Sequence, residues 1–251
     1  MTNTMLNIGD KKHNLPASIV KFALILLFFC PLESWGLDAE TVIKKLDNHY
    51  YYVQDYGLKK LTATVQWELN QKIKYFWKYP DKERFEVIAL DDQQNRKEAI
   101  LDFIENYRDT FVPKKVTDTL AGYRLKRMTD LDNMVYLKYV TKEQRQKIKE
   151  YTFWVDKEKF RIRKMEVSVG DAVISNKMTY IKKKGKWLVS SIHADYRRGG
   201  KTIPFLKSDF FYKKVRNFWL LSKITREGLT ENAGKLDNSI VLRINEYKTY
   251  L

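Results

Sequence analysis

The chain has 251 residues, which is enough for one domain with a sizeable hydrophobic core. Aromatic residues make up 14% of it while Gly and Pro are sparse, and this composition excludes collagen-like repeats and extended disorder. The formal net charge of +16 indicates an anionic partner, such as nucleic acid, lipid head groups or an acidic protein, or simply a means of keeping the chain in solution.

The first 36 residues have the organisation of a secretory signal peptide. Three lysines precede an apolar run at residues 22–30 (FALILLFFC), and Ser34 and Gly36 supply small residues where a signal peptidase cleaves. We therefore expect cleavage after Gly36 and a single domain at residues 37–251 in the periplasm. Because an exported protein does not meet nucleic acid, the anionic partners that remain are lipid head groups and acidic proteins.

Two other interpretations of this segment stay open. A retained membrane anchor would need roughly 20 apolar residues, and the stretch from Ile19 is shorter than that. A lipoprotein signal would use Cys30, but Phe28 and Phe29 stand where such a signal has small residues. Cleavage would remove Cys30, the only cysteine, so the remaining domain would have no disulfide and no thiolate for metal binding or nucleophilic attack.

Residues 38–55 are predicted to form the first helix. Asp38 is placed to cap it, Asp47 falls on its polar face, and residues 55–57 end it. Apolar residues recur at helical spacing on the other face, which consists of Val42, Ile43, Leu46, Tyr50 and Val53.

Three strands joined by short turns are predicted next, at residues 61–69, 73–79 and 85–89. The first alternates apolar with polar side chains, and the second alternates mainly aromatic with basic ones. Turns at residues 70–71 and 80–81 would fold the three strands into an antiparallel meander.

The middle of the chain is ambiguous, and the second half returns to strands. Residues 98–112 fit either a helix or two short strands, and a helical stretch is predicted from Pro113 to Gly122. The later strands are predicted at residues 135–139, 152–155, 162–169, 172–181, 187–196, 209–216, 218–226 and 240–247. So many antiparallel strands must close or be covered, because open edges invite aggregation. A strongly curved sheet with helices packed into its concave face meets this need and leaves an apolar cavity between sheet and helices.

The order of these segments resembles that of a known protein family. A capped helix (37–56, LDAETVIKKLDNHYYYVQDY) is followed by a Trp-bearing strand (61–69, LTATVQWEL) and a strand–Pro–strand unit (73–87, IKYFWKYPDKERFEV). Two later segments are YTFWVDKEKFRIRKMEVSVGD (151–171) and DFFYKKVRNFWLLSKITRE (209–227). The whole pattern, over most of residues 37–251, resembles the LolA-like family of outer-membrane lipoprotein-sorting proteins.

This resemblance implies a mainly β (α+β) fold, a half-open antiparallel β-barrel of about 10–11 strands with helices covering the concave face. It also implies a cavity that takes the acyl chains of lipoproteins in transit, with an inner-membrane exporter and an outer-membrane acceptor as partners. Typical members carry an Arg just before the strand-turn Pro, where it helps to hold the lid closed. Tyr79 stands at that place, so we expect Tyr79 to be the lid contact and the lid to be looser here.

The sequence contains no recognisable motif for catalysis or metal binding. His13, His49 and His193 have no metal-ligand spacing, and no nucleophile elbow, Walker or dinucleotide-binding pattern occurs. The basic Gly turn at residues 198–201 is predicted to be an exposed hairpin loop, with contact to anionic head groups as an alternative. We therefore expect no enzyme, no cofactor and no metal site, and an esterase is the least favoured interpretation.

Aromatic and aliphatic residues of the predicted strands are the candidates for lining the cavity. The set is Val65, Trp67, Tyr75, Trp77, Phe85, Val87, Ile174, Met178 and Ile192. Residue type does not separate a ligand-binding lining from an ordinary core, since both need the same side chains. The sequence thus favours a monomeric periplasmic carrier that binds acyl chains of lipoproteins or lipids for transfer toward the outer membrane. The alternative is a lipid sensor that signals to a membrane partner.

Overall fold

The computed structural model describes residues 37–67, 71–80, 82–89, 108–228 and 240–251. The chain divides into two compact units, Met1–Leu37 and Asp38–Leu251, and the fold described is that of the second unit. The expected signal peptide at residues 1–36 lies outside the described residues.

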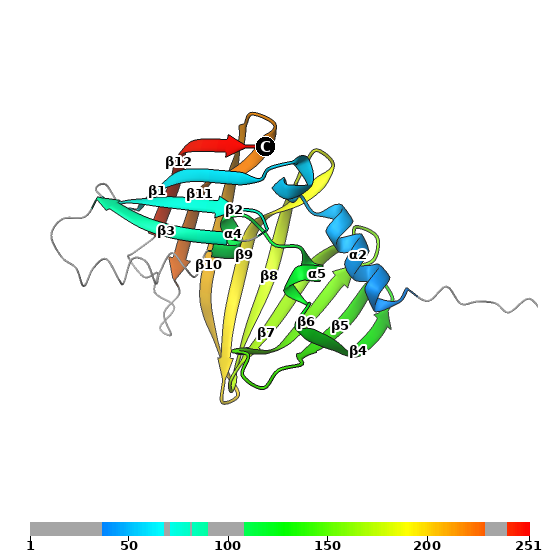
Figure 1. The fold of residues 1–251 in the computed structure, drawn as a ribbon. Coiled ribbons are helices and arrows are strands. Elements are labelled where there is room, and N and C mark those ends of the chain that lie inside the picture. The colour runs from blue at the N-terminus through cyan, green and yellow to red at the C-terminus, as the bar shows by residue number, and fades with distance from the viewer. Residues whose placement is uncertain (1–36, 68–70, 81, 90–107, 229–239) are drawn as a thin grey trace, which may run out of the picture. The chain divides into compact units, whose positions relative to one another are not determined.

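Twelve strands form one antiparallel sheet in the order β3-β2-β1-β12-β11-β10-β9-β8-β7-β6-β5-β4 (Figure 1). The N-terminal meander of β1 to β3 joins the rest of the sheet through the pairing of β1 with β12. The strands are β1 (Lys60–Trp67), β2 (Gln71–Lys78), β3 (Lys82–Ala89), β4 (Tyr123–Leu131), β5 (Met134–Thr141), β6 (Ile148–Asp156), β7 (Arg161–Val169), β8 (Ala172–Lys183), β9 (Lys186–Arg198), β10 (Lys201–Val215), β11 (Phe218–Gly228) and β12 (Ile240–Tyr250). The mainly β fold is confirmed, as an open sheet with β3 and β4 at its edges.

The described residues include four short helical elements beside the sheet: α2 (Ala39–His49), the 3-10 helix η1 (Val53–Tyr56), α4 (Arg108–Phe111) and α5 (Val116–Thr119). Helix α2 contacts α5 and strands β7 and β9 (Figure 1). Among the described residues, no helix is long and apolar enough to cross a membrane.

The first helix begins as predicted but ends earlier. The Asp38 side chain caps it by accepting hydrogen bonds from the Thr41 backbone nitrogen at 2.8 Å and the Thr41 hydroxyl at 2.6 Å. The helix ends at His49 because the next residues pair with the sheet: Tyr50 is extended and bridges to Trp187, and the Tyr51 nitrogen donates to the Trp187 carbonyl at 2.9 Å. The prediction that Tyr50 and Val53 continue the helical face was therefore wrong, since tertiary pairing overrides the helical spacing.

Two further predictions are corrected in the second half. Strand β4 was not predicted, because its sequence YRLKRMTDL is mostly exposed at the sheet edge and lacks apolar alternation. Strand β10 begins at Lys201 and not at residue 209, and its pairing with β9 shifts register just after Pro204, the residue that cannot donate to the ladder. In the ambiguous region, residues 108–111 are helical, so the two-strand alternative is wrong there; residues 90–107 lie outside the described part.

The hydrophobic core lies between the meander and the C-terminal strands. Its members include Trp77, Tyr75 and Ile73 of β2, which are at most 1% exposed, and Phe111 of α4, whose ring centroid is 4.9 Å from that of Tyr75. Full burial of such a side chain contributes about 1.5–3 kcal/mol. Leu188 of β9 and Phe210 of β10 also belong to this core, and they connect it to the cavity described next.

Candidate functional site: an apolar cavity

A cavity of about 220 Å³ lies between the sheet and two segments that cross its face. One segment is residues 50–52, directly after α2. The other contains α4 and α5, and we call residues 108–119 the strap. The lining residues are Tyr50, Tyr51, Tyr52, Thr110, Pro113, Lys114, Val116, Ile162, Met178, Tyr180, Trp187, Leu188, Val189, Ile192, Phe210 and Tyr212. Most of these side chains are aliphatic or aromatic, so the cavity suits an apolar ligand.

Two of the nine predicted lining residues, Met178 and Ile192, line this cavity. Val65, Tyr75 and Trp77 lie in the hydrophobic core, and Phe85 packs against it. Ile174 is half-buried in β8, opposite Tyr196. The side chains of Trp67 and Val87 lie outside the described part of the structure. The role of the full set in ligand binding stays a prediction.

Tyr79, the predicted lid contact, follows β2, and its side chain is 57% exposed. Its backbone nitrogen donates to the carbonyl of Lys59 at 2.9 Å. Tyr79 is not among the residues that line the cavity, and its role at a lid stays a prediction.

Three hydrogen bonds in a ring fix one wall of the cavity. The Ile162 nitrogen donates to the Tyr50 hydroxyl at 2.8 Å, the two hydroxyls of Tyr50 and Tyr180 are 3.0 Å apart, and the Tyr180 hydroxyl donates to the Ile162 carbonyl at 2.7 Å. The two tyrosine rings stack with their centroids 5.7 Å apart. Both hydroxyls thus form their hydrogen bonds within the protein, so neither of them needs a polar ligand as a partner.

The wall formed by Tyr50 and Tyr180, which we call the tyrosine wall, stays uncharged over the physiological pH range. Burial raises the pKa of Tyr50 to about 12, against the hydrogen bond from Ile162, which lowers it. Burial likewise raises the pKa of Tyr180 well above its ordinary value, and burial raises the pKa of Tyr212 on the next wall. An uncharged, internally satisfied wall favours hydrocarbon over an ionic ligand.

The strap is fastened to α2 and η1 by polar contacts. The buried Asp47 carboxylate accepts hydrogen bonds from the Val116 nitrogen at 2.7 Å and from the Tyr52 hydroxyl at 2.8 Å. Lys115 pairs with Asp55 at 2.7 Å, and the Gln54 side-chain nitrogen donates to the Pro113 carbonyl at 3.1 Å. Because Val116 and Pro113 also line the cavity, these contacts hold its front wall in place.

Sequence reasoning missed Asp47, which the helical pattern places on the solvent side. Its partners in the strap lie about seventy positions further along the chain, beyond any local signal. The histidines add no chemistry to the site: the His49 Nδ1 is 2.7 Å from the Lys45 carbonyl oxygen, and His193 is exposed on β9. Within the described residues, no group of three or more His, Cys, Asp or Glu could hold a metal ion.

Comparison with known proteins gives likenesses of fold alone. No protein-family model and no curated protein matches the sequence. Among solved structures, the chain is similar to a domain from Vibrio parahaemolyticus described as an outer membrane lipoprotein-sorting protein, with 11% identity, 83% of this chain and 90% of that chain covered, and a TM-score of 0.33. It is also similar to a LolA superfamily protein from Nitrosomonas europaea, with 12% identity, coverages of 85% and 94%, and a TM-score of 0.30.

A third likeness is to a DUF1329 family protein from Desulfovibrio piger, with 10% identity, coverages of 83% and 90%, and a TM-score of 0.31. The first two of these structures carry the names of the lipoprotein-sorting group that the segment order resembles. At these identities and TM-scores, the functional case rests on the cavity and its own residues.

Proposed function

We propose that the protein is a non-enzymatic carrier that binds an acyl chain of a lipid or lipoprotein in the cavity beneath the strap. The observation that carries this proposal is an apolar cavity with an uncharged tyrosine wall, lined on one side by a segment held through polar contacts. In this proposal residues 1–36 act as an export signal, and the ligand passes through the periplasm from an inner-membrane donor to an outer-membrane acceptor.

Burial of hydrocarbon supplies the binding free energy. Each methylene removed from water contributes about 0.8 kcal/mol, so ten methylenes contribute roughly 8 kcal/mol before the costs of association. Without those costs the dissociation constant would be about 1 μM, and the costs make binding weaker than that, so the ligand is releasable. No catalytic group is needed for this function.

The size of the cavity sets a condition on binding. Ligand pockets usually measure about 300–1,000 Å³, and this cavity measures about 220 Å³. The cavity therefore has room for part of one acyl chain, and a diacyl group requires the strap to move outward. The contacts of Asp47 and Asp55 with the strap are the ones that such a movement breaks.

Titration with a fluorescent fatty acid tests the site directly. Ile192→Trp enlarges a lining side chain and should weaken binding at least tenfold, because the added ring occupies the cavity. His193→Trp is the matched control, since its exposed side chain is next along the same strand and outside the lining. Equal affinities of the two variants and the parent protein would show that the fatty acid does not bind in this cavity.

Transfer between vesicles separates a carrier from a sensor. A carrier should speed the movement of a fluorescent lipid from donor to acceptor vesicles in proportion to protein concentration, whereas a sensor binds lipid without transferring it. Ile192→Trp should lose the acceleration and His193→Trp should keep it.

A further inference from the structure

Four segments that are distant in sequence meet at one end of the sheet. The Lys184 side chain in the β8–β9 turn donates to the Asn217 carbonyl of the β10–β11 turn at 2.7 Å, and Arg216 of that turn donates to the Thr249 carbonyl of β12 at 3.1 Å. The Lys59 nitrogen donates to the Tyr250 carbonyl at 3.0 Å. These contacts join the two turns to the end of β12 and the start of β1, which Figure 1 shows together.

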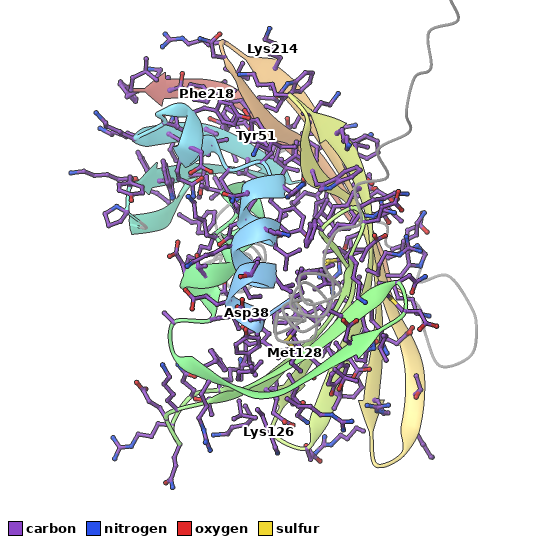
Figure 2. The ribbon with its side chains drawn as sticks, turned by 90° about the vertical axis from the view of Figure 1, so that its right-hand side faces the viewer. Asp38, Tyr51, Lys126, Met128, Lys214 and Phe218 are labelled. Carbon is purple, nitrogen blue, oxygen red and sulfur yellow. The ribbon has the colours of Figure 1, made fainter. Side chains whose placement is uncertain are left out.

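This end carries a concentration of positive charge. We call it the basic end and define it by Lys59, Lys60, Lys78, Lys184, Lys186, Lys214 and Arg216, together with Tyr79 and Tyr250. Figure 2 shows Lys214 at this end, well away from Lys126 of the edge strand β4.

In the described part of the structure, the cations of the basic end are contacted by neutral groups. None of its seven cations is paired with a carboxylate among the described residues; Lys184 and Arg216 donate to backbone carbonyls, and Lys186 donates to that of Asn48. Asp55 lies beside Tyr56 but pairs with Lys115. The cations therefore present positive charge to an outside partner.

Backbone conformation does not account for the cations at the two turns. Lys184 has φ 49° and Arg216 has φ 53°, both in the left-handed region that Gly and Asn adopt at lower cost. Both side chains are exposed, and each also makes a contact within the protein: Lys184 donates to the Asn217 carbonyl and lies 4.5 Å from the centre of the Tyr56 ring, and Arg216 donates to the Thr249 carbonyl. A basic side chain held at a turn tip at some conformational cost is consistent with a role in contacting a partner.

Exposed aromatic side chains accompany the charge. Tyr79 is 57% exposed and Tyr250 is 46% exposed, and the Lys60 ammonium lies 5.2 Å from the centre of the Tyr250 ring. Tyrosine is favoured where a protein meets lipid head groups, because its ring is apolar and its hydroxyl remains hydrated.

We propose that the basic end is a docking surface for a bilayer that contains anionic phospholipid. Several cations spread over separate segments suit the diffuse negative potential of a lipid surface, and the two exposed tyrosines suit its head-group layer. The surface also adjoins the cavity, since Trp187, which lines the cavity, follows Lys186 directly. Docking needs no ligand in the cavity and therefore stands or falls separately from the carrier function.

The test is co-sedimentation with vesicles of phosphatidylcholine, with or without phosphatidylglycerol. Lys184→Asn/Arg216→Asn should weaken binding to the anionic vesicles by about 30-fold, since each basic residue near such a surface strengthens binding roughly fivefold. Asn tolerates the left-handed conformation, so the variant should remain folded. Loss of the hydrogen bonds to the Asn217 and Thr249 carbonyls should lower its thermal midpoint slightly, and binding is therefore compared well below that midpoint. Lys126→Gln/Lys201→Gln removes the same charge from exposed positions outside the basic end and should bind like the parent.

Further measurements separate the alternatives. Added salt should weaken the binding, and Tyr79→Ser/Tyr250→Ser should weaken it at constant charge. Ile192→Trp should leave docking unchanged even where fatty-acid binding is lost. Equal binding to neutral and anionic vesicles, an equal loss in both charge variants, or tighter binding to a single-stranded oligonucleotide than to the anionic vesicles would overturn the proposal.

Discussion

The carboxylate of Asp47 accepts two hydrogen bonds from Thr117, at 3.1 Å from the backbone nitrogen and 2.7 Å from the hydroxyl. With the Val116 nitrogen on its other oxygen, Asp47 also satisfies backbone donors at the start of α5. One buried side chain of α2 thus holds the strap that lines one side of the cavity. The stability of this contact should control how often the cavity opens.

Asp47→Asn tests this relationship. The amide keeps one acceptor oxygen and loses the charge, so some strap donors lose their partner, at a cost of about 1–3 kcal/mol. We expect the urea midpoint of unfolding to fall and the uptake of a fluorescent fatty acid to become faster in stopped-flow measurements. Asp118→Asn is the control, because its side chain is exposed on α5. Unchanged uptake with a lowered midpoint would show that Asp47 supports the fold without gating the cavity.

The tyrosine wall makes stability depend on alkaline pH. Burial raises the pKa of Tyr50 from 10.0 in the unfolded chain to about 12 in the folded protein. The folded state therefore binds the Tyr50 proton more tightly than the unfolded chain does. The resulting contribution to the free energy of unfolding is fully present below pH 10 and is lost as pH rises through 12, at about 1.4 kcal/mol per pH unit. We expect the free energy of unfolding to fall between pH 10 and 12, less steeply in Tyr50→Phe. Urea titrations at each pH measure both slopes, and parallel slopes would contradict the assignment.

Substitution of Trp77 distinguishes a role in the hydrophobic core from a role in the cavity lining. Its side chain is 1% exposed and belongs to the hydrophobic core, and it is not among the residues that line the cavity. Trp77→Ala should lower the free energy of unfolding by about 3–5 kcal/mol, because it removes a large buried side chain. The fraction that remains folded should bind fatty acid with the parent affinity. A loss of affinity for fatty acid without a loss of stability would show instead that Trp77 lines the binding site.

The sequence pattern predicts the local elements of this fold well. The side chain of Asp38 caps the first helix, and the alternation around Tyr75 and Trp77 marks a strand with one buried face. These features depend on neighbours within a few positions, so periodicity and capping chemistry are enough to find them.

Features that depend on distant partners could not be predicted in this way. Tyr50 leaves the helix because Trp187 pairs with it from 137 positions away, and Asp47 turns inward because Thr117 supplies donors. The edge strand β4 shows no alternation because neither face of it is well buried. In each case the determining interaction forms only when the whole sheet is assembled.

Tyr79→Arg distinguishes the two roles considered for this residue. The resemblance to lipoprotein-sorting proteins predicts that an arginine here would hold the lid and slow the uptake and release of a fatty acid. The structure places the Tyr79 side chain 57% exposed at the basic end, outside the cavity lining. We therefore expect unchanged uptake and release, and binding to phosphatidylglycerol vesicles that is about fivefold tighter than that of Tyr79→Gln, because a cation has been added. Tyr79→Gln, which adds no charge, is the matched control; slower uptake in Tyr79→Arg alone would instead establish the lid contact.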